Sequence, residues 1–131
     1  MSTPEATRGG VRQVAPPAES GVLVSVVIPC LNEAANIEQC VTRARAVLEE
    51  HDLRGEVVVA DNGSDDGSAE LAERAGAHVV HEPRRGYGSA YLAGFAAAQG
   101  DYIVMADADL TYDFGYIPQF VAELDSGAEM V

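Results

Sequence analysis

Two carboxylates lie one residue apart at Asp107 and Asp109, directly after the mostly apolar segment 102–106. An apolar run of this kind predicts a strand buried in a sheet, and burying a carboxylate without a partner is costly. The two acids must therefore face a crevice, find partners or bind a cation, and a turn after the strand would let them converge. Convergent carboxylates are hard oxygen ligands for Mg²⁺ or Mn²⁺. The alternative is a pair of solvated loop acids, because a D-x-D motif is short enough to recur by chance.

The segments around this motif predict the elements that position it. Residues 1–21 lack an apolar core and are interpreted as a flexible leader, and strands and helices alternate after it. Strands are predicted at 22–28, 56–60, 77–80 and 102–106, with Pro29 ending the first. Helices are predicted between them: one capped by Asn32, one closed by Gly76, one from 86–88 to Gly100, and a last one from Pro118 to Gly127.

This alternation predicts an α/β domain over residues 22–131, with a mostly parallel sheet and helices on both faces. Ligands of such sheets bind beyond the carboxyl ends of the strands. Polar clusters follow three of the predicted strands, at 32–33, 61–66 and 107–113, so we expect them to share one edge. Residues 129–131 resemble the start of another strand, and the sheet is therefore expected to be incomplete at the C-terminus.

The composition excludes some classes of partner. The net charge is -13, from 21 acidic residues against 8 basic ones that are all Arg. This balance argues against binding nucleic acid, and the lack of Lys excludes a P-loop. A ligand that carries phosphate would need a bound cation to offset the acidic surface.

The redox and targeting signals indicate the cytoplasm. Cys30 and Cys40 are expected to be free, reduced thiols, and the sequence has neither a signal core nor an apolar run that could span a membrane. Association with the cytoplasmic face of a membrane would depend on sequence beyond Val131.

A glycine-flanked tyrosine at 86–88 invites a dinucleotide-binding interpretation, but Tyr91 occupies the third glycine position of that fingerprint. Two alternatives stay open: the glycines permit a tight helix start, or backbone N–H groups there face a phosphate together with Arg84 and Arg85.

Asp61 also follows an apolar strand and has two alternative roles. It could accept hydrogen bonds from a base or ribose, or form an Asx turn with the residues after it. Asp65 and Asp66 are interpreted as helix caps, Glu33 could belong to the first turn of its helix, and the three His residues are expected to be structural or exposed.

A competing enzymatic interpretation uses the same acids. The segment 107–111 is also similar to the nucleophile motif of haloacid-dehalogenase-type phosphatases, in which Asp107 would attack phosphorus and Asp109 would act as the acid or base. That motif normally lies on the first strand of its core, whereas three predicted strands precede it here.

Taken together, the motifs resemble those of family 2 glycosyltransferases of GT-A fold, most of all the branch of dolichyl-phosphate mannosyltransferases and polyprenyl-phosphate glycosyltransferases. The resemblance covers nearly everything after the leader, through VSVVIPCLNEAANI at 24–37, EVVVADNGSDDGS at 56–68, RRGYGSAYLAGFAAAQGDYIVMADADLTYDF at 84–114, and IPQFVAEL at 117–124. It implies that the chain is the nucleotide-sugar-binding half of a GT-A domain, truncated after that half.

The resemblance also implies roles for individual residues. The nucleotide-sugar site would comprise Pro29, Leu31, Asn32, Glu33, Asp61, Arg85, Gly88, Asp107 and Ala108, with Asp61 at the base. Asp107 would lie near the ribose and the metal, and Asp109 would hold Mg²⁺ or Mn²⁺ against the diphosphate. In the mannosyltransferase branch a Gln two residues later is commonly a further metal contact, and Thr111 takes its place here.

The implied reaction is transfer of a hexose from a donor of the GDP-mannose or UDP-glucose type to a polyprenyl or dolichyl phosphate, or to another glycan acceptor. A metal would neutralise the leaving diphosphate as a Lewis acid. A phosphate acceptor, with a second pKa of about 6, would need no strong base, whereas a sugar hydroxyl would need one, for which Asp113 is the candidate. The chain alone is expected to be inactive, and a non-catalytic nucleotide-binding fragment is the remaining alternative.

Overall fold

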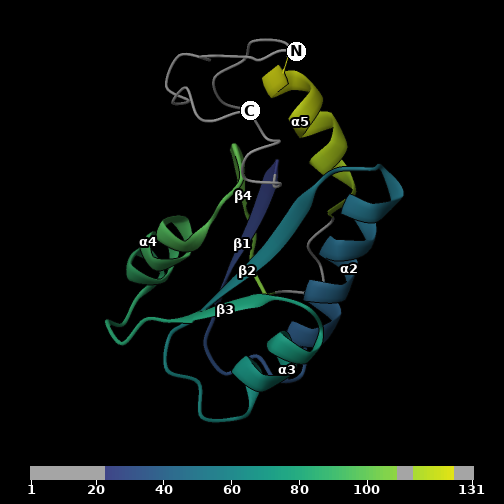
Figure 1. The fold of residues 1–131 in the computed structure, drawn as a ribbon. Helices are drawn as coiled ribbons and strands as arrows, with labels where there is room; N and C mark the ends of the chain where they lie inside the picture. Colours follow the sequence, from purple (N-terminus) through teal and green to yellow (C-terminus); the bar gives the residue numbers. More distant parts are fainter. Residues whose placement is uncertain (1–22, 109–113, 126–131) are drawn as a thin grey trace.

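The computed structural model describes residues 23–108 and 114–125 (Figure 1). Strands β1 (Val24–Cys30), β2 (Gly55–Asp61), β3 (His78–His81) and β4 (Tyr102–Met105) form a parallel sheet in the order β3-β2-β1-β4. The helices are α2 (Ile37–Glu50), α3 (Ser68–Arg74), α4 (Tyr87–Ala97) and α5 (Ile117–Asp125), the last preceded by the 3₁₀ turn η1 (Phe114–Tyr116). The predicted fold class is confirmed.

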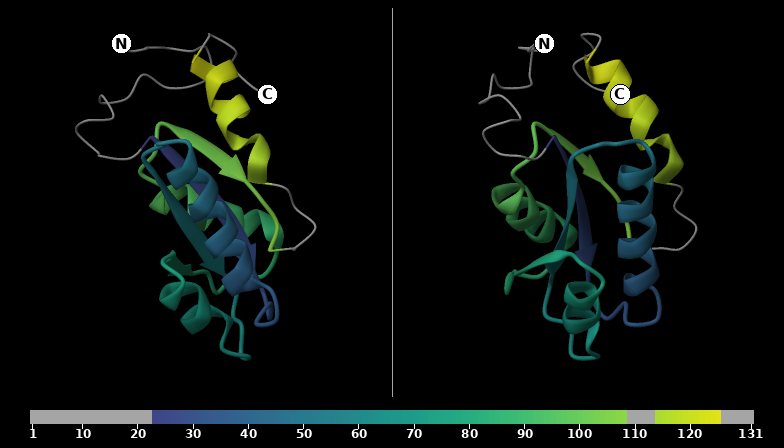
Figure 2. Two further views of the ribbon diagram at one scale, coloured as in Figure 1. Left: turned by 90° about the vertical axis from the view of Figure 1, so that its right-hand side faces the viewer. Right: turned by 45° about the vertical axis from the view of Figure 1, so that its right-hand side comes forward.

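Helices cover both faces of the sheet. Figure 2 shows α4 on one face and α2 with α5 on the other, and α3 packs beside α2. On the α2 face, Val26 and Ile28 of β1 belong to a buried cluster that also includes Ile37 of α2 and Ile117 of α5. Every residue of β1 is buried, as expected for a central parallel strand with helices on both sides.

Pro29 lies within β1, so the prediction that it ends the strand is wrong. It pairs with Ala60 in the register of β1 against β2. The backbone groups of successive strand residues point to opposite neighbours, and Val27 accepts from the Ala106 N–H on the β4 side while Cys30 accepts from the Asn62 N–H on the β2 side. The nitrogen of Pro29 therefore points to the β4 side, where the pairing of β4 has already ended at Val27.

Asn32 does not cap the first helix, contrary to the prediction. The helix begins five residues later at Ile37, with Asn36 as the N-cap residue. Asn32 adopts a positive φ of 55°, and its Oδ1 accepts a hydrogen bond from the Asp65 N–H. The side chain of Asn32, which was predicted to bond to the start of the helix, therefore bonds to a loop distant in the sequence.

The strand before the D-x-D motif is confirmed as β4, but it is only half buried. Tyr102 and Val104 face the core, whereas Ile103 and Met105 are exposed, Met105 by 53%. The prediction of a fully buried strand is wrong because β4 is an edge strand of the described sheet and α4 packs across β1 and β2 instead.

Of the two glycines predicted to close helices, Gly76 does so, whereas the prediction for Gly100 is wrong. Gly76 closes α3 with a φ of 109°, and the Ala77 N–H reaches back to the Ala72 carbonyl, as predicted. Helix α4 ends at Ala97, before Gly100, where a Cβ would lie 2.7 Å from the backbone nitrogen of Ser25. Gly100 therefore serves the close approach of two chain segments.

Some predictions concern residues outside the described ranges: the leader 1–21, the helix end at Gly127 and the further strand at 129–131. Within the described ranges, Cys30 and Cys40 form no disulfide, as predicted, and both are buried. None of the helices there has the length and apolar character needed to cross a membrane.

Candidate functional site

The carboxyl ends of β1, β2 and β4 bring the predicted polar clusters to one edge of the sheet. Cys30 pairs with Asp61 at the ends of β1 and β2, and the Ala106 N–H bonds to the Val27 carbonyl where β4 ends. The predicted meeting of these clusters is confirmed for their described members. Asp109, Thr111 and Asp113 lie outside the described residues.

A cavity of about 500 Å³ lies at this edge, within the size range of small-molecule sites. Its lining residues are Pro29, Leu31, Glu33, Asn36, Tyr87, Asp107 and Ala108. Five of these were predicted as nucleotide-sugar-binding residues, and sequence reasoning missed Asn36 and Tyr87. The signal for Tyr87 was its position between two glycines at a helix start, and the residue is 68% exposed.

The cavity combines an apolar wall with acidic groups. Pro29, Leu31 and Tyr87 supply apolar surface, whereas Glu33 and Asp107 supply carboxyl groups. Carboxylate oxygens suit a hard divalent cation and repel a phosphate. In residues 23–108 and 114–125, no three His, Cys, Asp or Glu side chains gather as a metal site, and the predicted metal ligands Asp109 and Thr111 lie outside these ranges.

Asp61 is 3% exposed, and its two carboxylate oxygens differ. Oδ2 accepts from the N–H groups of Gly63 at 3.2 Å and Ser64 at 3.0 Å, which is the Asx-type turn considered from the sequence. Oδ1 is buried and has no hydrogen-bond partner among the described residues. Such a group is costly unless a donor reaches it, and the described residues supply none. Asp61 does not line the cavity itself.

The three His residues are exposed, as predicted, but His81 has an environment that the sequence did not reveal. Its Nδ1 lies 3.9 Å from Oδ2 of Asp61. The pairing of β2 with β3, which sets Asp61 opposite His81, brings the two side chains together.

The loop from β1 to α2 is braced by the loop from β2 to α3. The Asn32 N–H bonds to Ser64 Oγ at 2.8 Å, the Glu33 N–H to Ser68 Oγ at 2.8 Å, and the Ala34 N–H to Asp66 Oδ2 at 3.1 Å. Free N–H groups in such a loop often bind phosphate, but these three are engaged. Asn32 therefore braces the loop and does not line the cavity, and the sequence did not reveal the roles of Ser64 and Ser68.

The N-cap residue of α3 is Gly67, and no side chain caps this helix, so the prediction that Asp65 and Asp66 are helix caps is wrong; Asp66 instead bonds to Ser68, the first residue of the helix. Its Oδ1 accepts from the Ser68 N–H at 3.1 Å and from the Ser68 hydroxyl. The bond from the Ser68 hydroxyl is the largest cause of the lowered pKa of Asp66, and the Ala34 N–H lowers that pKa further. The Asp65 side chain is exposed, and only its backbone N–H takes part in the bracing.

The two arginines before α4 have different surroundings. Arg84 pairs with Glu82 through Nε and Nη2, each at 3.0 Å, which raises the pKa of Arg84 and lowers that of Glu82. Arg84 is thus engaged, whereas the guanidinium of Arg85 lies over Gly63, with Nε 3.9 Å from where a Cβ would stand. Gly88 has open space around it, and neither Arg85 nor Gly88 lines the cavity.

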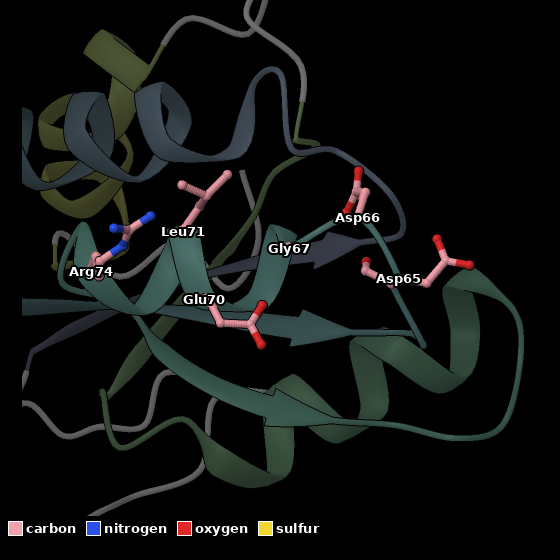
Figure 3. Close-up of a pocket in the computed structure, with 7 residues that line it drawn as sticks. Asp65, Asp66, Gly67, Glu70, Leu71 and Arg74 are labelled. Carbon is pink, nitrogen blue, oxygen red and sulfur yellow. The ribbon is translucent and has the colours of Figure 1, made fainter.

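A second hollow, of about 560 Å³, lies beside the start of α3 (Figure 3). Its lining residues are Ser64, Asp65, Asp66, Gly67, Glu70, Leu71 and Arg74. Three acids and one arginine make this surface unfavourable for an anion, and it shares no lining residue with the first cavity.

Comparisons with known proteins agree with this geometry. The sequence profile of glycosyl transferase family 2 matches residues 25–131. The chain is 47% identical over 104 residues to the low-salt glycan biosynthesis hexosyltransferase Agl6 of Haloferax volcanii, covering 79% of this chain and 25% of that protein. It is 37% identical over 115 residues to an undecaprenyl-phosphate 4-deoxy-4-formamido-L-arabinose transferase of Salmonella paratyphi A. This match covers 82% of this chain and 35% of that protein.

Among solved structures, glucosyl-3-phosphoglycerate synthase from Mycobacterium tuberculosis, in complex with Mn²⁺, UDP and phosphoglyceric acid, has a TM-score of 0.69 and 31% identity. The match covers 96% of this chain and 45% of that one, and the same enzyme has been crystallised with Mg²⁺ and UDP. The chain thus spans between 25% and 45% of the length of these three proteins.

Proposed function

The chain belongs to glycosyltransferase family 2, and on that premise we propose that residues 22–131 form the nucleotide-sugar-binding half of a hexosyltransferase that uses Mg²⁺ or Mn²⁺. The observation that carries the proposal is the cavity at the carboxyl edge of the sheet, with its apolar wall and its two carboxyl groups. Its volume suits a nucleotide, and its position matches where parallel sheets bind ligands.

The donor would be held by apolar contact and by one directed hydrogen bond. Pro29, Leu31 and Tyr87 offer surface on which a base or sugar can pack. The unpaired Oδ1 of Asp61 would accept from an N–H of the base or from a ribose hydroxyl. UDP in the similar mycobacterial synthase supports a nucleotide ligand.

The diphosphate needs positive charge that the cavity lining does not supply. Glu33 and Asp107 are acidic, and the N–H groups of the preceding loop are engaged. We therefore assign Asp107 and Asp109 to a divalent cation, with Thr111 as the third candidate ligand. When bound, the cation would supply Lewis-acid stabilisation of the leaving diphosphate. Arg85 would add charge from the neighbouring loop.

The acceptor would be a polyprenyl or dolichyl phosphate, or another glycan acceptor. The relative from Salmonella paratyphi A is named for undecaprenyl phosphate, which supports a lipid phosphate. Such an acceptor is largely ionised at neutral pH and needs no strong base. We place the reaction in the cytoplasm, at the membrane surface when the acceptor is a lipid, in keeping with two buried cysteines that form no disulfide within the described residues.

Calorimetric titration of the 131-residue chain with UDP and GDP, with and without Mn²⁺, tests the proposal. We expect one of the two nucleotides to bind in the presence of Mn²⁺ and to bind more weakly after EDTA. In Asp109→Ala, Mn²⁺ should no longer increase the affinity for that nucleotide. Asp65→Asn removes an equal charge from an exposed position and serves as the control. Binding that is equal in Asp109→Ala and the parent would refute the metal role.

The phosphatase interpretation has no specific observation in its favour. Asp107 follows β4, which comes fourth in the chain order and lies at the edge of the described sheet, unlike a motif on the first strand of a core. Release of inorganic phosphate from p-nitrophenyl phosphate, lost in Asp107→Asn, would reverse this preference.

A further inference from the structure

Asn62 follows β2 directly, is 5% exposed, and directs its amide at the segment 82–86 between β3 and α4. Its Nδ2 donates to the Glu82 carbonyl at 2.8 Å and to the Arg84 carbonyl at 2.7 Å. Its Oδ1 accepts from the Gly86 N–H at 2.9 Å. One side chain thus bonds to three backbone groups of a segment 20 to 24 residues away in the sequence.

These three bonds match the chemistry of a primary amide. The amide offers two donor hydrogens and an acceptor oxygen, and the segment presents two carbonyls and one N–H. A carboxylate of the same shape would still accept from Gly86, but its other oxygen would face two carbonyl oxygens without a proton to share. The site therefore selects Asn over Asp, although the two differ little in volume.

The held segment leads directly into the cavity wall. Gly86 has a φ of 116° and is the N-cap residue of α4, and Tyr87, the first residue of the helix, lines the cavity. The Glu82 N–H also bonds to the Asp61 carbonyl at 2.8 Å, and the Glu82–Arg84 ion pair stiffens the segment internally. The segment 82–86 is therefore held to the end of β2 in two ways: by the backbone bond of Glu82 to Asp61, and by the bonds of the Asn62 side chain to Glu82, Arg84 and Gly86.

We propose that Asn62 is a positioning residue, which clamps the segment 82–86 and thereby fixes Tyr87 as a wall of the donor cavity. The inference rests on the proposed function, since it assigns Tyr87 to the donor site. Asn62 acts through Tyr87, because its three amide positions are already used by the protein.

Limited trypsin digestion tests the clamp without any ligand. Arg84 and Arg85 are exposed cleavage sites within the segment, and Arg43 and Arg74, exposed on α2 and α3, serve as internal references. We expect Asn62→Asp to speed cleavage after Arg84 and Arg85 roughly tenfold or more relative to the references, because two hydrogen bonds are lost. Gln39→Glu makes the same amide-to-acid change on the exposed side of α2 and should leave the ratio unchanged.

An equal rise at all arginines would show general unfolding and overturn the clamp, as would no change in the ratio. If Asn62→Asp does not fold, Asn62→Ala removes the bonds without adding charge, and the same ratio decides. The chain has no Trp, so Tyr87→Trp gives a single fluorescent probe of the wall. Its emission anisotropy should fall when Asn62→Asp is added, and an unchanged anisotropy would also overturn the proposal.

Titration with UDP and Mn²⁺, or with GDP if that nucleotide binds, tests the positioning role. We expect Asn62→Asp to raise the Kd about tenfold in the parent and less than about twofold in a Tyr87→Ala background, since the clamp acts through that ring. Equal losses in both backgrounds would refute positioning through Tyr87. If neither nucleotide binds the parent, the proposed function fails, while the trypsin ratio and the anisotropy still decide the clamp.

Discussion

Replacing Asp61 by Asn separates a binding role from a structural one. Oδ2 of Asp61 closes the turn by accepting from Gly63 and Ser64, while the buried Oδ1 has no partner in the described structure. An Asn at this position keeps an oxygen for the two N–H groups and sets an NH₂ group where Oδ1 lies. The turn is preserved, but the oxygen that we propose as the acceptor for the donor nucleotide is replaced by a donor group.

The expected effects on binding and on stability differ in size and sign. A hydrogen bond to a charged group contributes about 1.5–3 kcal/mol, so its loss should raise the Kd for UDP or GDP with Mn²⁺ roughly 10- to 150-fold. For folding, Asp61→Asn weakens two charge-assisted bonds from N–H groups, but it also replaces a buried, unpaired charged oxygen by an uncharged NH₂ group, which is likewise unpaired. These terms oppose each other, so the free energy of unfolding should change by less than about 1 kcal/mol.

The assay pairs calorimetry with urea denaturation on the parent and three variants. Asp65→Asn removes the same charge from an exposed position on the same loop and should leave both quantities near those of the parent. Asp61→Ala also removes the turn acceptor and should lower the free energy of unfolding by about 1–3 kcal/mol. A parent-like Kd in Asp61→Asn would refute our reasoning, because Asp61 would then serve the turn alone.

Two further predictions concern stability. Gly94→Ala should lower the free energy of unfolding by about 1–3 kcal/mol, because the added methyl would overlap Cγ1 of the fully buried Val27. Gly88→Ala, on the same helix but with open space at its Cβ position, is the control and should not destabilise the fold. If urea denaturation shows that the effects of Gly94→Ala and Val27→Ala simply add in the double variant, the clash is contradicted. Burial raises the pKa of Cys30 from 9.0 to about 11. Between these two pH values the thiol is ionised in the unfolded chain but not in the folded one. The free energy of unfolding should therefore fall as pH rises, by at most about 1.4 kcal/mol per pH unit. Urea denaturation across pH 9–11 checks this, and a Cys30→Ala variant with the same slope would contradict it.

Much of the fold followed from local pattern. The helix predicted after the first strand forms as α2, which buries Ile37, Val41, Ala44 and Leu48, and β1 and β2 form where β-branched residues run together. Local pattern was less reliable for boundaries. Pro29 was predicted to end a strand that in fact continues past it. A proline is tolerated there because β4 stops pairing with β1 at Val27, so that no strand needs an N–H donor from Pro29, and local sequence does not show where β4 stops.

The candidate site divides in the same way. The positions of Glu33, Asp61 and Asp107 after strands were enough to predict that they meet at one edge. The roles of Ser64 and Asn62 were not predictable, because Ser64 bonds to an N–H 32 residues away and Asn62 to backbone groups 20 to 24 residues away. A polar side chain in a loop has many potential partners, and the sequence does not show which of them the fold brings within reach.

The sequence by itself determined the alternation of strands and helices, the acidic character of the chain and the edge at which its chemistry gathers, because periodicity and charge are properties of neighbouring residues. Only the tertiary structure decided that Asn32 braces a loop, that Tyr87 forms a cavity wall, and that one oxygen of Asp61 is paired while the other has no partner among the described residues. The physical reason is that hydrogen bonds act over about 3 Å, so the role of a polar group is set by the chain segment that packs against it.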